Sequence, residues 1–335
     1  MGGNVFKFQY DVVRLSAESY FETVRQVKTL LDGIQSGLAY HDVQAMYEKT
    51  DFGDMDLVVN TNDPEQIQLH SEYLSNLGYP VSRNGDVLSF LYHNFQIDLI
   101  FIPTESFDYA CNYFAWNDLG NIVGRLSKKL GFKHGHSGLW YIQRDYDVVV
   151  KEYLLSADYL TILGILGLDV EHFKKGFNNS LEMFEWAGKS PYFDPEIFKF
   201  ENLNHINRVR DRKRKVYNEL VKWSTEVWKP DPNVTYLTPP AKEDRRAFVL
   251  NLYPEIAQPI FALELELSLQ REASKKFNGK IVMELIPELS GKSLGAFLTY
   301  FKSKQVHFTA YALNATTEDI RMDILTLYQE YIKDV

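Results

Sequence analysis

Two apolar segments of this chain contain acidic residues at positions that a strand would place on one face. Residues 52–59 read Phe-Gly-Asp-Met-Asp-Leu-Val-Val, and residues 95–101 read Phe-Gln-Ile-Asp-Leu-Ile-Phe. Side chains alternate between the two faces of a strand, so Asp54 and Asp56 project from the same face. Asp98 lies between two apolar residues, and a lone carboxylate there is costly to bury unless it is paired or bound to a cation. The fold must therefore either gather the three acids or leave them in solvent.

The segments around these acids predict an α+β unit. Apolar residues recur at helical spacing between residues 16 and 36, with Ser16 as the N-cap. The other expected elements are a strand at 55–60, a helix at 64–77 that ends at Gly78, and strands at 87–92 and 95–102. His93 and Asn94 separate the last two strands and suit a tight hairpin. A strand, a helix and a hairpin in close succession are typical of a mixed sheet rather than of a repeating βα pattern.

Length and composition narrow the class of protein. The chain has 335 residues, enough for two or three domains with their own cores. Its one cysteine, Cys111, cannot form an internal disulfide, and we expect a cytoplasmic protein. No apolar run approaches the roughly 20 residues of a membrane span, so no membrane partner is expected. The net charge of −9 does not indicate a nucleic-acid binder, although a local basic patch is enough for one.

Three carboxylates on neighbouring strands would form a metal site. If the strands at 55–60 and 95–102 are neighbours, Asp54, Asp56 and Asp98 converge on one patch. Clustered carboxylates repel one another, and a divalent cation such as Mg²⁺ relieves that repulsion. Two such ions can activate an attacking hydroxyl and stabilise a leaving pyrophosphate. The prediction is a two-metal Mg²⁺ site, with Mn²⁺ as the alternative ion; the simpler interpretation is a solvated strand end.

The residues that follow these acids are spaced as in a known group of enzymes. The pattern is Gly-Asp-x-Asp on one strand, a lone Asp on a later strand, a Pro-containing turn, an aromatic pair, and then an Asp, an Asn and an Arg. Here these residues are Gly53, Asp54, Asp56, Asp98, Pro103, Tyr113, Phe114, Asp118, Asn121 and Arg125. Residues 50–142 thus resemble the nucleotidyltransferase superfamily that includes the family X DNA polymerases, such as DNA polymerase beta.

The resemblance implies roles for the acids and for the aromatic pair. Asp54 and Asp56 would bind the metal ions that carry the triphosphate. Asp98 would hold the catalytic metal and take the proton from the primer hydroxyl. Tyr113 and Phe114 would pack against the sugar of the incoming nucleotide. The alternative for this pair is ordinary core packing on an amphipathic helix.

The resemblance also implies contacts with the nucleotide and with nucleic acid. Gly53, Asp118 and Asn121 would contribute to nucleotide binding, with Asp118 and Asn121 beside the incoming base. Arg125 would reach the template strand or its equivalent. The alternative for Arg125 is a surface side chain near Lys128 and Lys129.

The chain departs from the family where the terminal phosphates of the nucleotide are held. The family's Gly-Ser pair is replaced by Val43 and Gln44, and its phosphate-binding arginine by Tyr47. Lys49, Gln44 and nearby backbone amides are the candidate replacements. The family's Thr-Gly-Ser reads Ala-Trp-Asn at residues 115–117, which removes the glycine of a sharp turn.

Residues 208–215 form the densest basic stretch, with six basic residues in eight positions. Such a stretch can contact successive phosphates with an affinity that falls as salt rises. A solvated helix face is an equally good interpretation. The residues that we assign to nucleic-acid binding are Arg125, Arg208, Arg210, Arg212, Lys213 and Arg214.

The expected organisation has three parts. They are a nucleotidyltransferase palm-like domain at 1–105, a thumb-like helical subdomain at 106–152 and a mainly helical C-terminal domain at 153–335. The proline-rich residues 230–240 are the linker candidate. A stretch within 279–304 is faintly similar to tRNA CCA-adding enzymes. A helix that packs its apolar residues inward explains that stretch equally well; these residues are Leu294, Phe297, Leu298 and Phe301.

The predicted function is Mg²⁺-dependent transfer of a nucleoside monophosphate from a nucleoside or deoxynucleoside triphosphate to the 3′ hydroxyl of DNA or RNA. One alternative is a CCA-type enzyme that extends tRNA 3′ ends. The other alternative is a catalytically silent nucleic-acid-binding relative, which the replaced Gly-Ser pair favours. The sequence does not indicate an oligomeric state.

Overall fold

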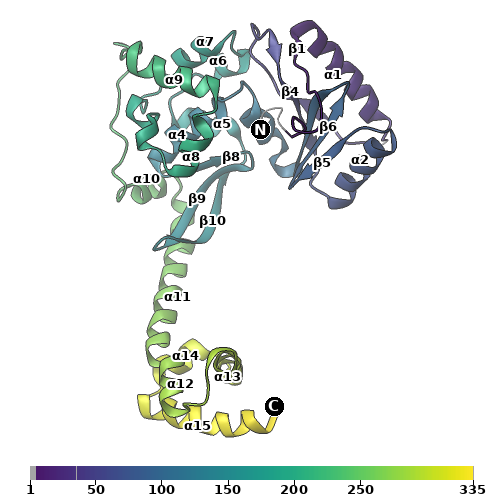
Figure 1. The fold of residues 1–335 in the computed structure, drawn as a ribbon. Helices are drawn as coiled ribbons and strands as arrows, with labels where there is room; N and C mark the ends of the chain where they lie inside the picture. The colour runs from purple at the N-terminus through teal and green to yellow at the C-terminus, as the bar shows by residue number, and fades with distance from the viewer. Residues whose placement is uncertain (1–4, 35, 335) are drawn as a thin grey trace. The chain divides into compact units, whose positions relative to one another are not determined.

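The structure, a computed structural model, describes residues 5–34 and 36–334 and has two compact units, Met1–Tyr253 and Pro254–Val335 (Figure 1). The predicted α+β class is confirmed, with a mixed sheet and a helical C-terminal region. The predicted boundaries at 105/106 and 152/153 both lie inside the first unit. Among the described residues, no helix combines the length and apolar character that a bilayer-spanning segment requires.

A five-stranded sheet forms the centre of the N-terminal part of the first unit (Figure 1). Its strands, in spatial order, are β2 (Tyr40–Asp42), β4 (Asp54–Asn60), β7 (Phe95–Ile102), β6 (Val87–Tyr92) and β5 (Val81–Asn84). The central pair β4 and β7 is parallel, and the other pairs are antiparallel. A short ladder joins β1 (Leu15–Ser16) to β3 (Asp51–Phe52). The strands expected at 55–60, 87–92 and 95–102 are confirmed, whereas β2 and β5 were not predicted.

Two helices cover one face of this sheet, α1 (Ala17–Asp32) and α2 (Pro64–Asn76) (Figure 1). The Ser16 side chain accepts a hydrogen bond from the Ser19 backbone N–H and caps α1 as predicted. The buried core beneath the helices includes Leu31, Leu57 and Leu99. On β4 and β7, these core residues are at the odd-numbered positions from Met55 and Phe95 onward.

The opposite face of the sheet packs on α3 (Phe107–Phe114). Val58 and Ile100 contact Ala110 and Cys111 there. Because side chains alternate along a strand, the even-numbered positions of β4 and β7 all point to this face. The three aspartates of the Gly-Asp-x-Asp pattern and of β7 are at such positions. The strand pattern that builds the core therefore places the carboxylates on the α3 side.

The rest of the first unit is helical apart from one small sheet. Residues 133–156 form the antiparallel sheet β10-β9-β8, whereas the thumb-like prediction for 106–152 was helical. In β10, buried and exposed side chains do not alternate, because Tyr153 is its one buried residue. The elements are η1 (Thr104–Ser106), α4 (Leu119–Leu130), β8 (Lys133–Gly135), β9 (Gly138–Asp145), β10 (Val148–Ser156), α5 (Tyr159–Ile165), α6 (Val170–Lys175), α7 (Ser180–Ala187), η2 (Pro195–Ile197), η3 (Phe200–Asn202), α8 (His205–Asp211), α9 (Lys215–Glu226) and α10 (Arg245–Leu252).

The second unit is a set of helices around its own apolar core. Phe297 and Phe301 are fully buried in it, and Leu294 and Leu298 are partly buried, so the predicted inward packing of this helix is confirmed. The Ser290 and Ser293 side chains form a capping box at the start of that helix. The elements are η4 (Pro254–Ile256), α11 (Ala257–Lys276), α12 (Gly279–Leu285), α13 (Gly291–Lys304), α14 (Phe308–Asn314) and α15 (Thr317–Asp334).

Candidate functional site

The parallel pairing of β4 and β7 brings the three predicted aspartates together. Asp56 lies opposite Asp98 in the ladder, and Asp54 lies opposite Gln96. One carboxylate oxygen from each aspartate lies within 4.8 Å of the others. The two segments singled out in the sequence thus form one acidic cluster, Asp54, Asp56 and Asp98, at the centre of the sheet.

Asp98 is the most buried member of the cluster, with 1% of its surface exposed. The Gln96 side-chain amide donates hydrogen bonds to Oδ1 and Oδ2 of Asp98, at 2.9 and 3.0 Å. Gln96 is itself buried, and its Oε1 accepts a hydrogen bond from the Val5 backbone N–H. Burial raises the pKa of Asp98, and hydrogen bonds from Ser89 and Gln96 oppose that rise. The carboxylate is thus fixed in orientation by its neighbour on the same strand.

Asp56 has an unsatisfied oxygen. Its Oδ1 is shielded from solvent and has no hydrogen-bond partner among the described residues. Burial raises the pKa of Asp56 to about 8, and the charges of Asp54 and Asp98 add to the rise. A divalent cation would satisfy this oxygen and offset the repulsion, and Mg²⁺ takes oxygen ligands. The residues present therefore fit the metal that the sequence predicted.

One lysine balances part of this negative charge. The Lys49 ammonium lies 4.5 Å from the centroid of the Phe52 ring. Burial lowers the pKa of Lys49, and the charges of Asp54 and Asp56 act in the opposite direction. The negative charge of the acidic cluster thus acts on Lys49. This lysine is a candidate replacement for the missing phosphate-binding residues.

Gly53 lies beneath the exposed side chain of Arg14. The guanidinium of Arg14 forms an ion pair with Asp51 at 2.6 Å and lies over the Gly53 backbone. A Cβ atom at Gly53 would be 2.4 Å from the Arg14 Nη1 atom. The predicted nucleotide-binding glycine therefore allows an arginine side chain to lie beside the start of β4.

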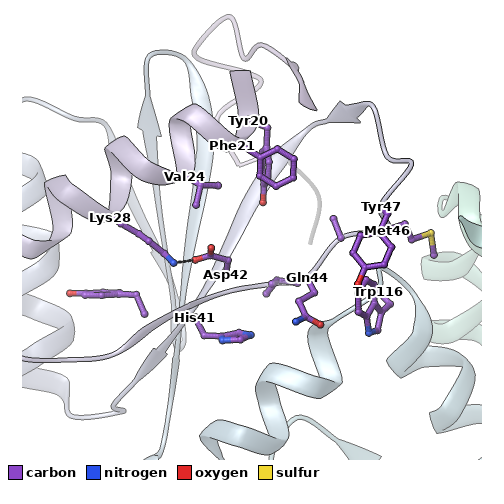
Figure 2. A pocket seen from close by; sticks show the side chains of 13 residues that line it. Tyr20, Phe21, Val24, Lys28, His41, Asp42, Gln44, Met46, Tyr47 and Trp116 are labelled. Atoms are coloured by element: carbon purple, nitrogen blue, oxygen red, sulfur yellow. Dashed lines mark ion pairs between the residues drawn. The ribbon is translucent and has the colours of Figure 1, made fainter. Parts of the chain in front are cut away.

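A pocket of about 570 Å³ lies at the sheet edge, between α1, β2 and residues 43–47 (Figure 2). The Val43 backbone N–H donates to the Asp56 carbonyl at 3.2 Å, so this loop runs alongside the strand that carries the acids. Lys28 and Asp42 form an ion pair on its wall (Figure 2). Its aromatic lining consists of Tyr20, Phe21, Tyr40, His41, Tyr47 and Trp116. The acidic cluster does not line it, and the sequence did not predict it.

Residues 43–47, where the chain departs from the family pattern, connect the sheet to the helical part of the first unit. The Tyr47 hydroxyl donates to the Lys175 carbonyl at 2.6 Å, and its backbone N–H donates to the Phe177 carbonyl. The Trp116 backbone N–H donates to the Gln44 carbonyl at 2.8 Å. Tyr47, which stands where the family has an arginine, therefore makes contacts that hold this unit together.

The chain turns sharply after the aromatic pair, although the glycine of the family's turn is absent there. Trp116 and Asn117 have φ values of 61° and 59°, in the left-handed region. Tyr113 and Phe114 precede it at the end of α3 and are half-buried. The Tyr113 ring lies 5.1 Å from that of His134, and Phe114 stacks on His136 at 5.8 Å. The aromatic pair is thus held against two histidine rings.

The predicted nucleotide residues of α4 and the basic stretch meet in one network. Arg125 forms a buried ion pair with Asp211, so the structure places it inside the protein. Arg210 donates to Asn121 Oδ1 at 3.0 Å, and Arg214 forms an ion pair with Asp118. The other members of the stretch are Arg208, which donates to the Leu203 carbonyl; Arg212, over the Phe200 ring; and Lys213, which is exposed.

Two residues of these networks were missed by sequence reasoning. Gln96 is two positions before Asp98 and therefore on the same strand face, which is the signal that identifies it. Asp211 is the one acid within residues 208–215, and an acid surrounded by arginines signals a paired carboxylate. A comparison of the sequence with models of protein families and with curated proteins gives no match.

Proposed function

We propose that this chain is a Mg²⁺-dependent nucleotidyltransferase that transfers a nucleoside monophosphate from a nucleoside triphosphate to the 3′ hydroxyl of a nucleic acid. The observation that carries this proposal is the acidic cluster, with one oxygen of Asp54, Asp56 and Asp98 within 4.8 Å of the others. The unsatisfied Oδ1 of Asp56 adds a second reason for a cation there. When bound, Mg²⁺ supplies positive charge that activates the attacking hydroxyl and stabilises the leaving pyrophosphate.

Asp98 is our candidate for the proton acceptor. Gln96 fixes both of its oxygens, so the carboxylate is preorganised toward the cluster. Burial raises the pKa of Asp98, which brings it closer to the pH at which a general base is efficient. Asp54 and Asp56 are then the remaining metal ligands. In this division Asp54 and Asp56 act as metal ligands, and Asp98 acts both as a metal ligand and as the base.

The substrate contacts are assigned to the aromatic pair with the residues that follow it, and to the basic stretch. Tyr113 and Phe114 offer aromatic surface for the nucleotide sugar, and the Asn121 and Asp118 network follows on α4. Lys213 and Arg212, both exposed on the basic stretch, offer charge to the phosphates of the acceptor strand. DNA, RNA and tRNA 3′ ends share this chemistry, and the choice among them is made by experiment.

The test is incorporation of a labelled nucleotide by the full chain with Mg²⁺ and a primer. Asp98→Asn removes the proposed base and is expected to slow incorporation by about 100-fold or more. Asp147→Asn is the matched control, because Asp147 is an exposed acid in the turn after β9. Incorporation by Asp98→Asn at the rate of the control would contradict the proposal.

The same assay, together with calorimetric titration of the triphosphates and nucleic acids, separates the alternatives. Gapped DNA, an RNA primer and a tRNA that lacks its 3′ end are offered with each triphosphate in turn. Extension of the tRNA alone would identify the CCA-type activity. Metal-dependent triphosphate binding without extension of any acceptor would contradict transfer to a nucleic-acid 3′ hydroxyl. Nucleic-acid binding without metal-dependent triphosphate binding would identify a silent relative and contradict the enzymatic proposal.

A further inference from the structure

Asp211, at the end of α8, is a buried carboxylate surrounded by arginines. None of its side-chain surface is exposed, and it pairs with Arg125, whose side chain is 9% exposed. Arg210 contacts both of its oxygens, with Nε at 2.7 Å from Oδ1 and Nη2 at 3.2 Å from Oδ2. Arg214 Nε lies 4.0 Å from Oδ1. One carboxylate thus hydrogen-bonds two guanidinium groups and lies near a third.

The cluster of Asp211 with its arginines retains positive charge. Three guanidinium groups face two carboxylates, since Arg214 also pairs with Asp118. Arg210 and Arg214 are the exposed members, with 46% and 32% of their side chains accessible. Among the described residues, the Arg210 contacts use Nε and Nη2, which leaves Nη1 for a ligand. The exposed side of the cluster is therefore a fixed set of N–H donors.

This donor set contacts Asn121 and Asp118, two of the predicted nucleotide-binding residues. Arg210 donates a hydrogen bond to Asn121. Burial raises the pKa of the Tyr113 hydroxyl, and the charges of Arg210 and Arg214 oppose that rise. The basic stretch also acts on β3. The pKa of Asp51 is lowered chiefly by its hydrogen bond with Arg14 and also by the charge of Lys215, the first residue of α9. The charge of Lys215 thus acts on β3, the short strand that precedes Asp54.

We propose that Arg210 and Arg214, positioned by buried Asp211, form an anion-binding subsite for the triphosphate group of the nucleotide. This inference rests on the proposed function, and it places the triphosphate, rather than the base, beside Asp118 and Asn121. It supplies the positive charge that residues 43–47 lack, because that loop offers Val43, Gln44 and Tyr47 in place of a phosphate-binding set. Asp211 is a positioning residue: it acts through the two arginines, and neither its oxygens nor its charge attract the ligand.

A triphosphate suits this pair better than a nucleic-acid backbone does. A strand presents one phosphate per nucleotide along a line, and flexible exposed lysines and arginines meet it adequately. A triphosphate is a compact polyanion, and forked guanidinium groups held in one orientation match it closely. Arg210 and Arg214 are held by Asp211 and Asp118, whereas Lys213 is exposed. The fixed pair is therefore assigned to the compact ligand.

The test is calorimetric titration of the full chain with inorganic tripolyphosphate in EDTA, which keeps metal out of the acidic cluster. Arg210→Gln and Arg214→Gln are each expected to weaken binding by about 10-fold to 100-fold. Lys222→Gln is the matched control, because it removes one exposed charge from α9 and should change binding by less than about twofold. Arg210→Lys keeps the charge without the fork and is expected to weaken binding as well.

Asp211→Asn is the most informative variant. It makes the cluster more positive, so attraction by net charge alone predicts tighter binding of tripolyphosphate. A positioning role predicts weaker binding, by about 10-fold or more, because the arginines lose their fixed orientation. A melting curve reports whether this variant is folded. If it is not, the exposed Arg210 and Arg214 variants decide.

Three results would overturn the subsite: no binding of tripolyphosphate by the wild type, wild-type binding by both arginine variants, or tighter binding by folded Asp211→Asn. A larger loss for a single-stranded oligonucleotide than for tripolyphosphate would assign the pair to the acceptor strand instead. Incorporation with Mg²⁺ is measured separately. Incorporation without a role for the arginine pair would retain the enzyme and reject the subsite. Arginine-dependent tripolyphosphate binding without incorporation would retain the anion-binding subsite and reject the enzyme.

Discussion

The Asp56 carboxyl group occupies a site that opposes its ionisation. Its pKa of about 8 in the folded chain is above the ordinary value of about 3.9 expected when unfolded. At a pH between these two values, the Asp56 carboxyl group keeps its proton in the folded state and has lost it in the unfolded state. Stability therefore falls as pH rises from about 4 to about 8, and the loss is complete above about pH 8. A bound cation replaces the proton and removes this loss.

Asp56→Asn tests this linkage. In EDTA, the melting temperature of the wild type is expected to fall relative to that of Asp56→Asn between about pH 5 and about pH 8. Mg²⁺ should then raise the wild-type value at pH 8 more than at pH 5, since carboxylates must be deprotonated to bind it. Asp147→Asn serves as the control with no expected pH effect. A difference between wild type and Asp56→Asn that is constant across this range would contradict the assignment.

Sequence reasoning at this scale identified residues whose chemistry is unusual for their position. Asp98 is recognisable because a carboxylate between apolar neighbours needs a partner. The identity of that partner, Gln96, depends on which strand face is buried and which residue lies beside it. Asp211 was counted with a solvated basic stretch, because the sequence does not show that α4 lies against α8. The need of Asp98 for a partner was predictable, whereas the partners Gln96 and Arg125 were not.

Among the elements, the turn between α3 and α4 carries the clearest strain. Asn117 is exposed and has a φ of 59°, a conformation that costs most residues about 1–2 kcal/mol and that asparagine tolerates better. Asn117→Ala is expected to lower the free energy of unfolding by about 1 kcal/mol, and Asn117→Gly to leave it unchanged or higher. Urea denaturation measures both. Asn76→Ala, at the exposed end of α2, is the control. Equal stability of the alanine and glycine variants at position 117 would refute this account.

The elements that were predicted are those with strong local patterns. β6, β7 and α2 are long enough for their periodicity and turn residues to be read directly. β2 has three residues and β5 has four, which is too short for a pattern to be distinct. β10 has mostly exposed side chains, so its strand state depends on pairing with β9. The register of β4 against β7 follows from packing that no single segment encodes.

At the scale of the whole molecule, the two compact units have separate apolar cores. Leu57 is fully buried in the first and Phe297 in the second. We expect calorimetry to resolve two thermal transitions. Leu57→Ala should destabilise one transition and Phe297→Ala the other, each by about 2–5 kcal/mol. A single transition that both substitutions shift equally would show that the units unfold together.

The α+β class could be predicted from the sequence, but the position of the boundary could not. Residues 230–240 are rich in proline and suggested a linker. In the structure, the Tyr236 hydroxyl donates to the Gly188 carbonyl at 2.9 Å, and the Leu237 backbone N–H donates to the Pro191 carbonyl at 2.7 Å. The segment therefore packs on the first unit. Proline content reports backbone conformation and says nothing about distant partners.

The alternation of side chains along β4 and β7 fixes both the apolar core on one face of the sheet and the carboxylates on the other. Leu57 and Leu99 point to α1 and α2, and the neighbouring Asp56 and Asp98 point the other way. Losing one residue from the interior of either strand would exchange these sets, burying carboxylates among leucines and turning leucines toward the face of the acidic cluster. An insertion in the loops at either end of this pair would thus keep both faces intact, while one within either strand would not.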